Sequence, residues 1–297
     1  MQTPLSTAAP QSIRWWADRR GWPLAAIGVV LIASGLAHLL VWAMLGGAWE
    51  GPATWRKPIL FGISGGLTCL SLGWAWAQLP WRRGDGWLAA ATAWSLLVEV
   101  GLIDLQRWRG VASHFNRQTP LDSFLFDAMG ALILFATLVI VDLTIRFLRQ
   151  RTTLPADMLL AARSGLVFLA ISCLLGILIS AYGDLRSAAG LPPETYGAAG
   201  VAKFPHGMAM HAIQWLPLLA WAARRAGLSE PRRSRLVACS TVGTAILLGY
   251  ALVQTLAGRD RFDAPPASAA LLAIGGACLA VPAVVTAALL VAHLRRT

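Results

Sequence analysis

Hydrophobic residues in this chain gather in long blocks that are separated by short polar segments. About eight such blocks stand out, at roughly 23–46, 58–79, 86–106, 120–147, 159–181, 205–223, 235–257 and 267–293. Since an α-helix rises about 1.5 Å per residue, about 20 residues cross the roughly 30 Å hydrocarbon core of a bilayer. The blocks are rich in Leu and Ala and do not alternate apolar with polar residues, which favours helices over barrel strands. The pattern predicts an all-α integral membrane protein, a bundle of about eight transmembrane helices.

Prolines agree with the expected helix starts. They stand at or near the beginning of four blocks, at Pro23, Pro58, Pro120 and Pro205. Proline is tolerated in the first turn because the N–H that it lacks has no helical partner there. Thr119 and Asp122 form a capping-box-like start around Pro120, so we interpret Asp122 as a helix cap. Pro217 and Pro282 lie inside blocks and should bend their helices.

Composition and charge add an orientation. Of 297 residues, 57% are hydrophobic and 13% are charged, whereas soluble domains carry about 25% charged residues. With the N-terminus inside, 16 of the 25 Lys and Arg residues fall in inner segments, as the positive-inside rule requires. We therefore expect cytoplasmic N- and C-termini in the plasma (inner) membrane. The net charge of +11 then reflects topology and contact with the lipid bilayer, and we expect no nucleic-acid partner.

The chain divides into two expected parts. Residues 1–22 form a cytoplasmic or interfacial N-terminal segment, in which Trp and Arg mix as in an interfacial helix. Residues 23–297 form a single polytopic transmembrane domain. Its four cysteines lie in different blocks without a CxxC pair, so we interpret them as packing residues. Ser172, Gly176 and Ser180 recur every four residues and predict a close-packing helix face.

Ionisable residues inside the blocks carry the functional information, because a charge in hydrocarbon is costly. His38, Glu99, Asp127 and His211 each lie six or seven residues from the expected outer end of a different helix. At about 1.5 Å per residue, all four sit roughly 10 Å below the outer surface. On the cytoplasmic side we expect almost no buried charge except Asp142, which can pair with Arg146 four residues later.

This quartet suggests a metal or cofactor site. Imidazoles and carboxylates suit a divalent metal such as zinc or iron. Two histidines at equal depth, His38 and His211, also suit haem b, with Gly35 and Gly207 leaving room for the ring. The chain contains no HExxH and no CxxCH motif, so the hypothesis depends on depth rather than on a motif.

A polar rim is expected above the quartet. Its members are Lys57, Asp104, Arg107, Arg109, His114, Asn116, Arg117, Lys203 and His206. Three arginines in one outer loop suggest pairing with carboxylates or with an anionic ligand. His206 and His211 point about 140° apart on a helix, so we assign His206 to the rim and His211 to the deep site.

Three functions fit these residues. The first is a metal or haem centre for redox or membrane-substrate chemistry, with a small-molecule, lipid or quinone-like ligand. The second is proton-coupled transport of a small or anionic solute, because histidines and carboxylates relay protons. The third is a lipid-directed hydrolase or transferase that uses Ser113 and His114. Whether the protein is an enzyme, and its oligomeric state, are left open by the sequence.

Overall fold

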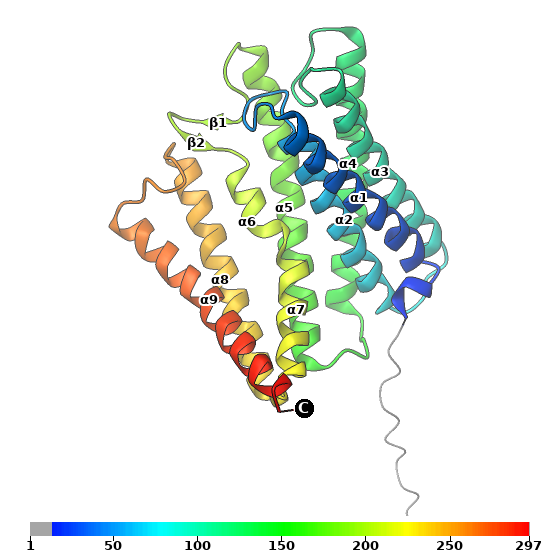
Figure 1. The fold of residues 1–297 in the computed structure, drawn as a ribbon, viewed down its shortest axis with the longest axis vertical. Coiled ribbons are helices and arrows are strands. Elements are labelled where there is room, and N and C mark those ends of the chain that lie inside the picture. The colour runs from blue at the N-terminus through cyan, green and yellow to red at the C-terminus, as the bar shows by residue number, and fades with distance from the viewer. Residues whose placement is uncertain (1–13, 297) are drawn as a thin grey trace, which may run out of the picture.

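Seven long helices and two short ones make up most of the described part of the chain (Figure 1). The computed structural model describes residues 14–296. The long helices are α1 (Gly21–Leu45), α2 (Arg56–Ala77), α3 (Asp85–Trp108), α4 (Pro120–Arg149), α5 (Ala156–Ala188), α8 (Glu230–Leu256) and α9 (Pro266–Leu294). Each of the seven is long and apolar enough to cross a membrane. By helix length and hydropathy the chain is therefore a multi-pass membrane protein, as predicted.

The sixth predicted helix is interrupted. It consists of α6 (Phe204–Met210) and α7 (Ala212–Arg225), with His211 between them. An antiparallel pair of two-residue strands, β1 (Thr195–Tyr196) and β2 (Gly200–Val201), precedes α6. The predicted span therefore exists as two short helices, which Figure 1 shows one above the other.

The helices run between two ends of the bundle. We call one the β-hairpin end, because it carries β1 and β2 and the connections 46–55, 109–119, 189–203 and 257–265 (Figure 1). The opposite end carries the connections 78–84, 150–155 and 226–229 and the described C-terminal residues. Both groups of loops agree with the predicted alternation of inner and outer segments, and cytoplasmic termini remain a prediction.

The N-terminal segment is only partly described. Residues 1–13 of the predicted segment 1–22 lie outside the described residues. In place of the expected interfacial helix, Trp15–Ala17 form one turn of 3-10 helix, named η1, and α1 already begins at Gly21. Arg20 is 4% exposed and donates hydrogen bonds to Asp18 and to the carbonyl of Leu79, so this segment is anchored to the bundle.

Glycines bring α1 and α2 into backbone contact. A Cβ on Gly66 would lie 2.5 Å from the carbonyl oxygen of Gly28, and one on Gly62 would lie 2.8 Å from Cα of Gly35. Small residues allow this approach in membranes, where packing rather than hydrophobicity drives helix association. The predicted haem-access role of Gly35 is therefore wrong for this arrangement, because its open face is filled by α2 near Ile63.

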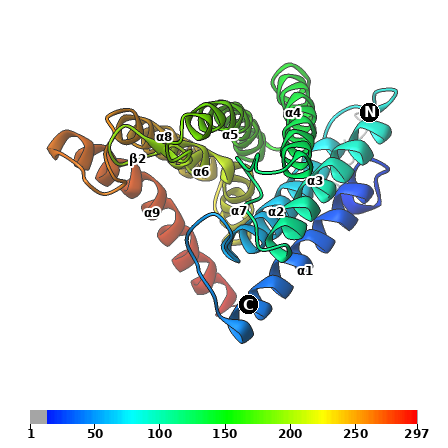
Figure 2. The ribbon, with the colours of Figure 1, turned by 90° about the horizontal axis from the view of Figure 1, so that it is seen from above.

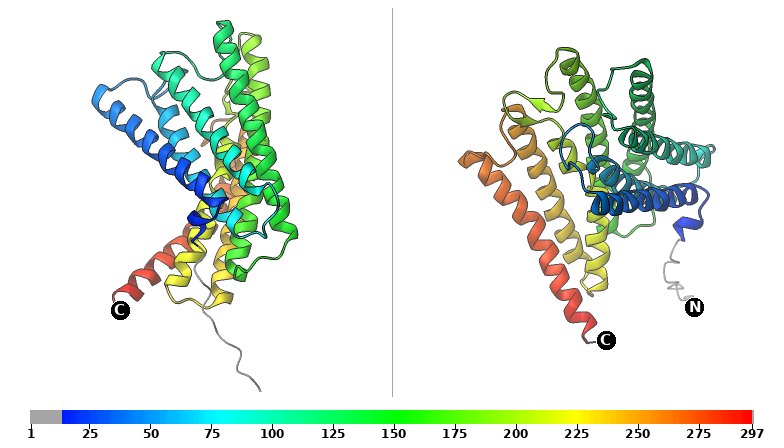
Figure 3. Two further views of the ribbon diagram at one scale, coloured as in Figure 1. Left: turned by 90° about the vertical axis from the view of Figure 1, so that its right-hand side faces the viewer. Right: turned by 45° about the horizontal axis from the view of Figure 1, so that its top comes forward.

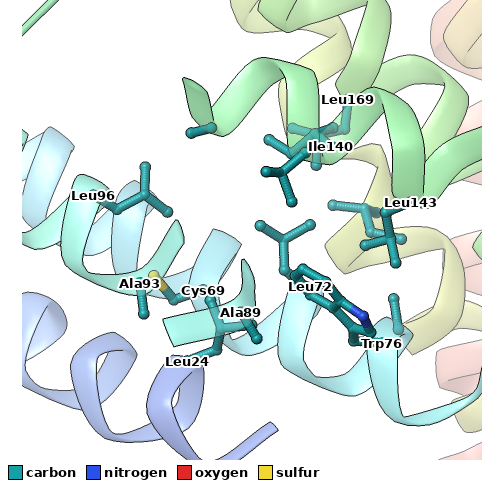
Figure 4. Packing of buried hydrophobic residues seen from close by; sticks show 14 of the residues in the cluster. Leu24, Cys69, Leu72, Trp76, Ala89, Ala93, Leu96, Ile140, Leu143 and Leu169 are labelled. Carbon is teal, nitrogen blue, oxygen red and sulfur yellow. The ribbon is translucent and has the colours of Figure 1, made fainter. Parts of the chain in front are cut away.

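A buried apolar cluster joins α1 to α5. Figure 4 shows Leu24, Cys69, Trp76, Leu143 and Leu169 within it, and all five are at most 2% exposed. All four cysteines are free thiols, with Cys69 buried and the other three partly buried, and their role as packing residues stays a prediction. Figure 2 shows α1 and α9 on opposite flanks with α2 and α7 between them, and Figure 3 shows α9 beside α8 at the edge of the bundle.

Buried ion pairs tie the helices together at the opposite end. Arg146 donates to both carboxylate oxygens of Asp85, at 2.8 and 2.9 Å, and Arg20 lies 3.7 Å from the same carboxylate. Asp157 is fully buried between Arg224 and Arg233. The expectation of almost no buried charge on this side is wrong, because paired charges can be buried where single ones cannot.

The predicted Asp142–Arg146 pair is present at 3.8 Å. Asp142 also lies 3.4 Å from Arg82, and it is 42% exposed. Arg146 has its closer partner in Asp85. Asp142 is therefore a partly exposed member of this charge cluster and not the buried exception that we expected.

Candidate functional site

His38 is fully engaged by its neighbours. Its Nε2 accepts a hydrogen bond from the indole N–H of Trp108, at 3.0 Å, and its Nδ1 lies 2.9 Å from the carbonyl oxygen of Ser34. An indole nitrogen can only donate and a carbonyl can only accept. The ring must therefore be neutral with its proton on Nδ1, so neither nitrogen is free to bind a metal or haem iron.

Asp104 stands beside this histidine. It accepts a hydrogen bond from the hydroxyl of Ser34 at 3.0 Å, and its carboxylate lies 4.0 Å from Nδ1 of His38. Its other oxygen, Oδ1, is buried without a hydrogen-bond partner. Asp104, which we expected in the rim, belongs to a contact between α1 and α3.

Asp127 lies at an exposed ion pair. Arg117 bridges it to Asp184, with distances of 2.9 Å to each carboxylate. The side chain of Asp127 is 62% exposed. These hydrogen bonds raise the pKa of Arg117 above its ordinary value, with Asp184 first and Asp127 second. The bridge joins the loop before α4 to α5.

Glu99 is buried in the bundle. It is 5% exposed, and no hydrogen bond or ion pair satisfies its carboxyl group within residues 14–296. It lies within electrostatic range of the Cys173 thiol of α5. An uncompensated carboxylate is costly at membrane depth. Glu99 is therefore the one member of the quartet that is buried without a hydrogen bond or ion pair among the described residues.

The quartet does not form one metal centre in this arrangement. His38 is bonded to Trp108, and Asp127 is paired with Arg117. Across residues 14–296, no three or more His, Cys, Asp or Glu side chains come close enough to hold a metal ion. Equal depth along four helices did not bring these side chains together, because depth fixes neither the rotation of a helix nor its neighbours.

His211 occupies the interruption between α6 and α7. Its backbone has φ −94° and ψ 7°, and its carbonyl oxygen accepts hydrogen bonds from the N–H groups of Gln214 and Trp215. The predicted bend at Pro217 does not account for this break. Proline has no N–H, so the carbonyl that loses its helical partner is that of Ile213, which lies after His211. Ile213 instead packs its backbone on α5, where a Cβ on Gly165 would lie 2.6 Å away.

Polar side chains surround the break. The hydroxyl of Ser64 on α2 lies 3.3 Å from Nε2 of His211 and 3.3 Å from the sulfur of Met210. The side chain of Gln214 lies close enough to the His211 ring to interact with it, but neither its amide oxygen nor its amide nitrogen, both buried, makes a hydrogen bond of ordinary geometry within residues 14–296. An unsatisfied amide in a membrane costs several kcal/mol. We define Ser64, His211 and Gln214 as the break site.

His206, which we expected in the rim, is half-buried and packs against α5. Its Nδ1 lies 2.7 Å from the carbonyl oxygen of Ser172, while the Ser172 hydroxyl donates to the carbonyl of His206 at 2.9 Å. Gly176 makes room for the ring, because a Cβ there would lie 3.3 Å from it. The predicted packing face on α5 thus exists at Ser172 and Gly176. Gly207 opposes no atom within 4 Å, so its predicted role stays a prediction.

His114 is enclosed by aromatic rings at the β-hairpin end. The rings of Phe61, Phe115 and Phe126 lie 5.9–6.3 Å from it, and Nδ1 is 3.0 Å from the hydroxyl of Ser113. Burial lowers the pKa of His114 to about 3, with a smaller contribution from Lys57. Ser113 is 3% exposed. A buried serine with a weakly basic neighbour does not favour the hydrolase hypothesis.

Other rim residues stabilise the loops of this end. Arg109 binds Asp122 at 2.8 Å. The predicted capping start of α4 is present, but Thr119 is the cap: its side-chain oxygen accepts from the N–H of Asp122, and its hydroxyl donates to the Asp122 carboxylate. Asn116 donates to the carbonyl of Ala112. Lys203 binds Glu194, a partner that we did not single out from the sequence. Burial acts to raise the pKa of Glu194, but Lys203 outweighs it, so this pKa lies below its ordinary value.

Two expected rim cations, Lys57 and Arg107, have no carboxylate partner within the described residues.

Sequence reasoning missed the polar side chains that contact the histidines, which are Ser64, Trp108 and Ser172. Serine and tryptophan are common in transmembrane helices, so spacing marked only Ser172, and it did so as a packing residue and not as a partner of His206. Comparison with protein-family models, with curated proteins and with solved structures finds no match for this chain.

Proposed function

We propose that this protein transports a small polar solute across the membrane and binds it at the break site. The observation that carries the proposal is the interruption of a membrane span at His211, beside the unbonded amide of Gln214. Interrupted helices expose backbone and polar groups at membrane depth, and they form the substrate sites of many transporters. Such irregular backbone is tolerated in a membrane where it lines a cavity or is buried in protein.

The break site offers matched donors and acceptors. The amide of Gln214 can donate through its nitrogen and accept through its oxygen, and Ser64 adds a hydroxyl. His211 adds a neutral imidazole, which has one ring nitrogen that donates a hydrogen bond and one that accepts. These groups suit a solute that both donates and accepts hydrogen bonds, such as an amide, a polyol or a zwitterion.

Glu99 is the residue that we propose for proton coupling. Its carboxyl group is buried on α3, in the same bundle as the break site, and it has no cationic partner among the described residues. Ionisable residues of this kind mark proton relays in transporters. Loss of its titration should uncouple solute movement from a pH gradient without removing the solute site.

Three observations favour transport over the other two hypotheses. Both ring nitrogens of His38 are occupied, which removes one axial ligand of the proposed haem. Asp127 is paired with Arg117 near the surface. Ser113 is buried beside a histidine of low pKa. The visible spectrum of the purified protein provides an independent check on haem.

The test uses the full chain in proteoliposomes. Amino acids, polyols, amides and small carboxylates are applied in turn under a pH gradient, and charge movement is recorded on a solid-supported membrane. We expect a saturable signal for at least one class, lost in Gln214→Leu and uncoupled from pH in Glu99→Gln. Gln78→Leu is the matched control, because Gln78 lies at the opposite end and bonds Trp74. No signal above that of empty liposomes for any class contradicts transport.

A further inference from the structure

Three hydrogen-bond donors without ordinary partners line one shallow depression at the β-hairpin end. They are Thr54 in the loop before α2, Lys57 in the first turn of α2 and Arg107 in the last turn of α3. Ser113 lines the same depression from the loop before α4. Segments far apart in the sequence therefore present polar groups to one place.

Each of the three donors is unsatisfied in a different way. Thr54 is 2% exposed, and its hydroxyl has no hydrogen-bond partner. Nε of Arg107 is buried without a partner, while the guanidinium group lies 3.9 Å from the ring centre of Trp55. Lys57 has no hydrogen bond or ion pair within residues 14–296. A buried hydroxyl or guanidinium group without a partner is unfavourable, so a partner from outside the chain would remove the penalty.

Three other cations at this end of the bundle already form an ion pair with a carboxylate, unlike Lys57 and Arg107. Arg109 binds Asp122, Arg117 binds Asp127 and Asp184, and Lys203 binds Glu194. The charge of Glu194 acts on Lys57, but the Glu194 carboxylate forms its hydrogen bond with Lys203. The depression therefore carries two positive charges that no described carboxylate contacts directly.

The Arg107 guanidinium group lies over the Trp55 ring, a cation–π contact that restricts its movement. A guanidinium fork of restricted orientation suits a carboxylate or phosphate, because two parallel N–H groups can bind two oxygens. Lys57 adds a second, movable charge, and Thr54 adds a hydroxyl. The depression is too shallow to enclose a whole ligand, so only the charged group of a ligand would rest on it.

We propose that Thr54, Lys57 and Arg107 form a binding site for an oxyanion, either a carboxylate or a phosphate. The oxyanion belongs to an anionic lipid headgroup or to a free solute, since both present the same oxygens. The proposal does not depend on transport, because it concerns a site at the end of the bundle and not the break site.

The test measures thermal unfolding of the purified full chain in a neutral detergent. Inorganic phosphate and succinate are titrated at constant ionic strength against chloride. In parallel, nanodiscs of phosphatidylglycerol are compared with nanodiscs of phosphatidylcholine. We expect saturable stabilisation by a free oxyanion, by phosphatidylglycerol or by both, and the arm that responds identifies the source.

Variants make the assignment specific. Lys57→Gln and Arg107→Gln should each weaken the response about tenfold, because each removes a charge-assisted hydrogen bond. Arg186→Gln is the matched control, since Arg186 lies at the same end and binds only the carbonyl of Pro192 among the described hydrogen bonds. Thr54→Val separates binding from folding, because it should weaken the response without lowering the unfolding temperature of the ligand-free protein.

Two results overturn the proposal. One is the same unfolding temperature with phosphate, succinate and phosphatidylglycerol as in the chloride and phosphatidylcholine controls. The other is a stabilisation that Lys57→Gln and Arg107→Gln leave unchanged.

Discussion

The indole N–H of Trp108 donates a hydrogen bond to Nε2 of His38 at 3.0 Å, joining α3 to α1. This bond fixes the neutral tautomer of His38, whose Nδ1 then donates to Ser34. His38 is 8% exposed, so its ring has little water to replace a lost partner. The histidine acts here as a structural residue that holds two helices at one depth.

Replacing the donor should therefore weaken the bundle. Trp108→Phe leaves Nε2 of His38 without its partner, and we expect a loss of about 1–2 kcal/mol in unfolding free energy. Trp87→Phe is the matched control, because Trp87 is 84% exposed. Thermal unfolding in detergent compares the two variants, and equal unfolding temperatures would show that the bond contributes little.

Backbone contact between α1 and α2 should tolerate no added methyl group. In Gly66→Ala the new Cβ would lie 2.5 Å from the carbonyl oxygen of Gly28, so the helices must separate. We expect a loss of about 1–3 kcal/mol, as for other overpacked sites. Gly130→Ala meets no atom within 4 Å and should be neutral or slightly stabilising, because alanine favours helix. Equal stability of the two variants, measured by thermal unfolding, would argue against this packing.

The buried Asp85–Arg146 pair should be costly to break. Asp85→Asn leaves Arg146 and Arg20 without their shared carboxylate, and removal of one partner of a buried pair costs about 3–5 kcal/mol. Asp142→Asn removes the other carboxylate that pairs with Arg146, and this carboxylate is 42% exposed. The change should lower the free energy of unfolding by at most about 1 kcal/mol. Urea or heat unfolding of both variants tests the difference, and a larger loss in Asp142→Asn would reverse our assignment.

Acid should destabilise the protein through His114. The pKa of this residue is lowered to about 3 in the folded protein by burial, from 6.5 in a free chain. The unfolded state therefore binds a proton first, and stability falls as the pH drops from about 6.5 toward 3. The slope due to this one group is at most about 1.4 kcal/mol per pH unit.

His114→Gln should reduce the change in unfolding free energy between pH 7 and pH 5. Glu194, whose pKa is lowered, also loses its stabilising effect in acid, but only as the pH falls below its ordinary value of 4.5. The window above pH 5 therefore excludes the contribution of Glu194, and the difference between the two proteins in this window measures the contribution of His114. An unchanged slope in His114→Gln would place the acid sensitivity elsewhere.

Much of the fold follows from hydrophobic length. The predicted blocks 23–46 and 120–147 became Gly21–Leu45 and Pro120–Arg149. Thr119 and Pro120 fixed the start of α4 as expected, because capping is a local property of the chain. The interruption at His211 was not predicted, since its environment comes from Ser64 on α2 and from α5.

Side-chain partners were harder to predict than depth. His38 and Asp127 lie on different helices at similar expected depth, yet one faces Trp108 and the other Arg117. Helix rotation and packing decide such contacts, and a single sequence encodes them only through weak preferences. Arg117 and Arg109 did follow the expected pairing of loop arginines with carboxylates, because charge complementarity acts between neighbouring loops.

Access of water to the break site tests the central claim most directly. Gln214→Cys is treated with a membrane-impermeant thiol reagent, first in intact cells, where we expect the β-hairpin end to face outward, and then in inverted vesicles, which present the opposite end. The unsubstituted protein gives the background of its four free cysteines. Leu218→Cys on α7, 59% exposed in the bundle and expected to face lipid, is the control. Transport through the break predicts reaction of Gln214→Cys from both sides and of Leu218→Cys from neither, whereas protection of Gln214→Cys from both sides would contradict it.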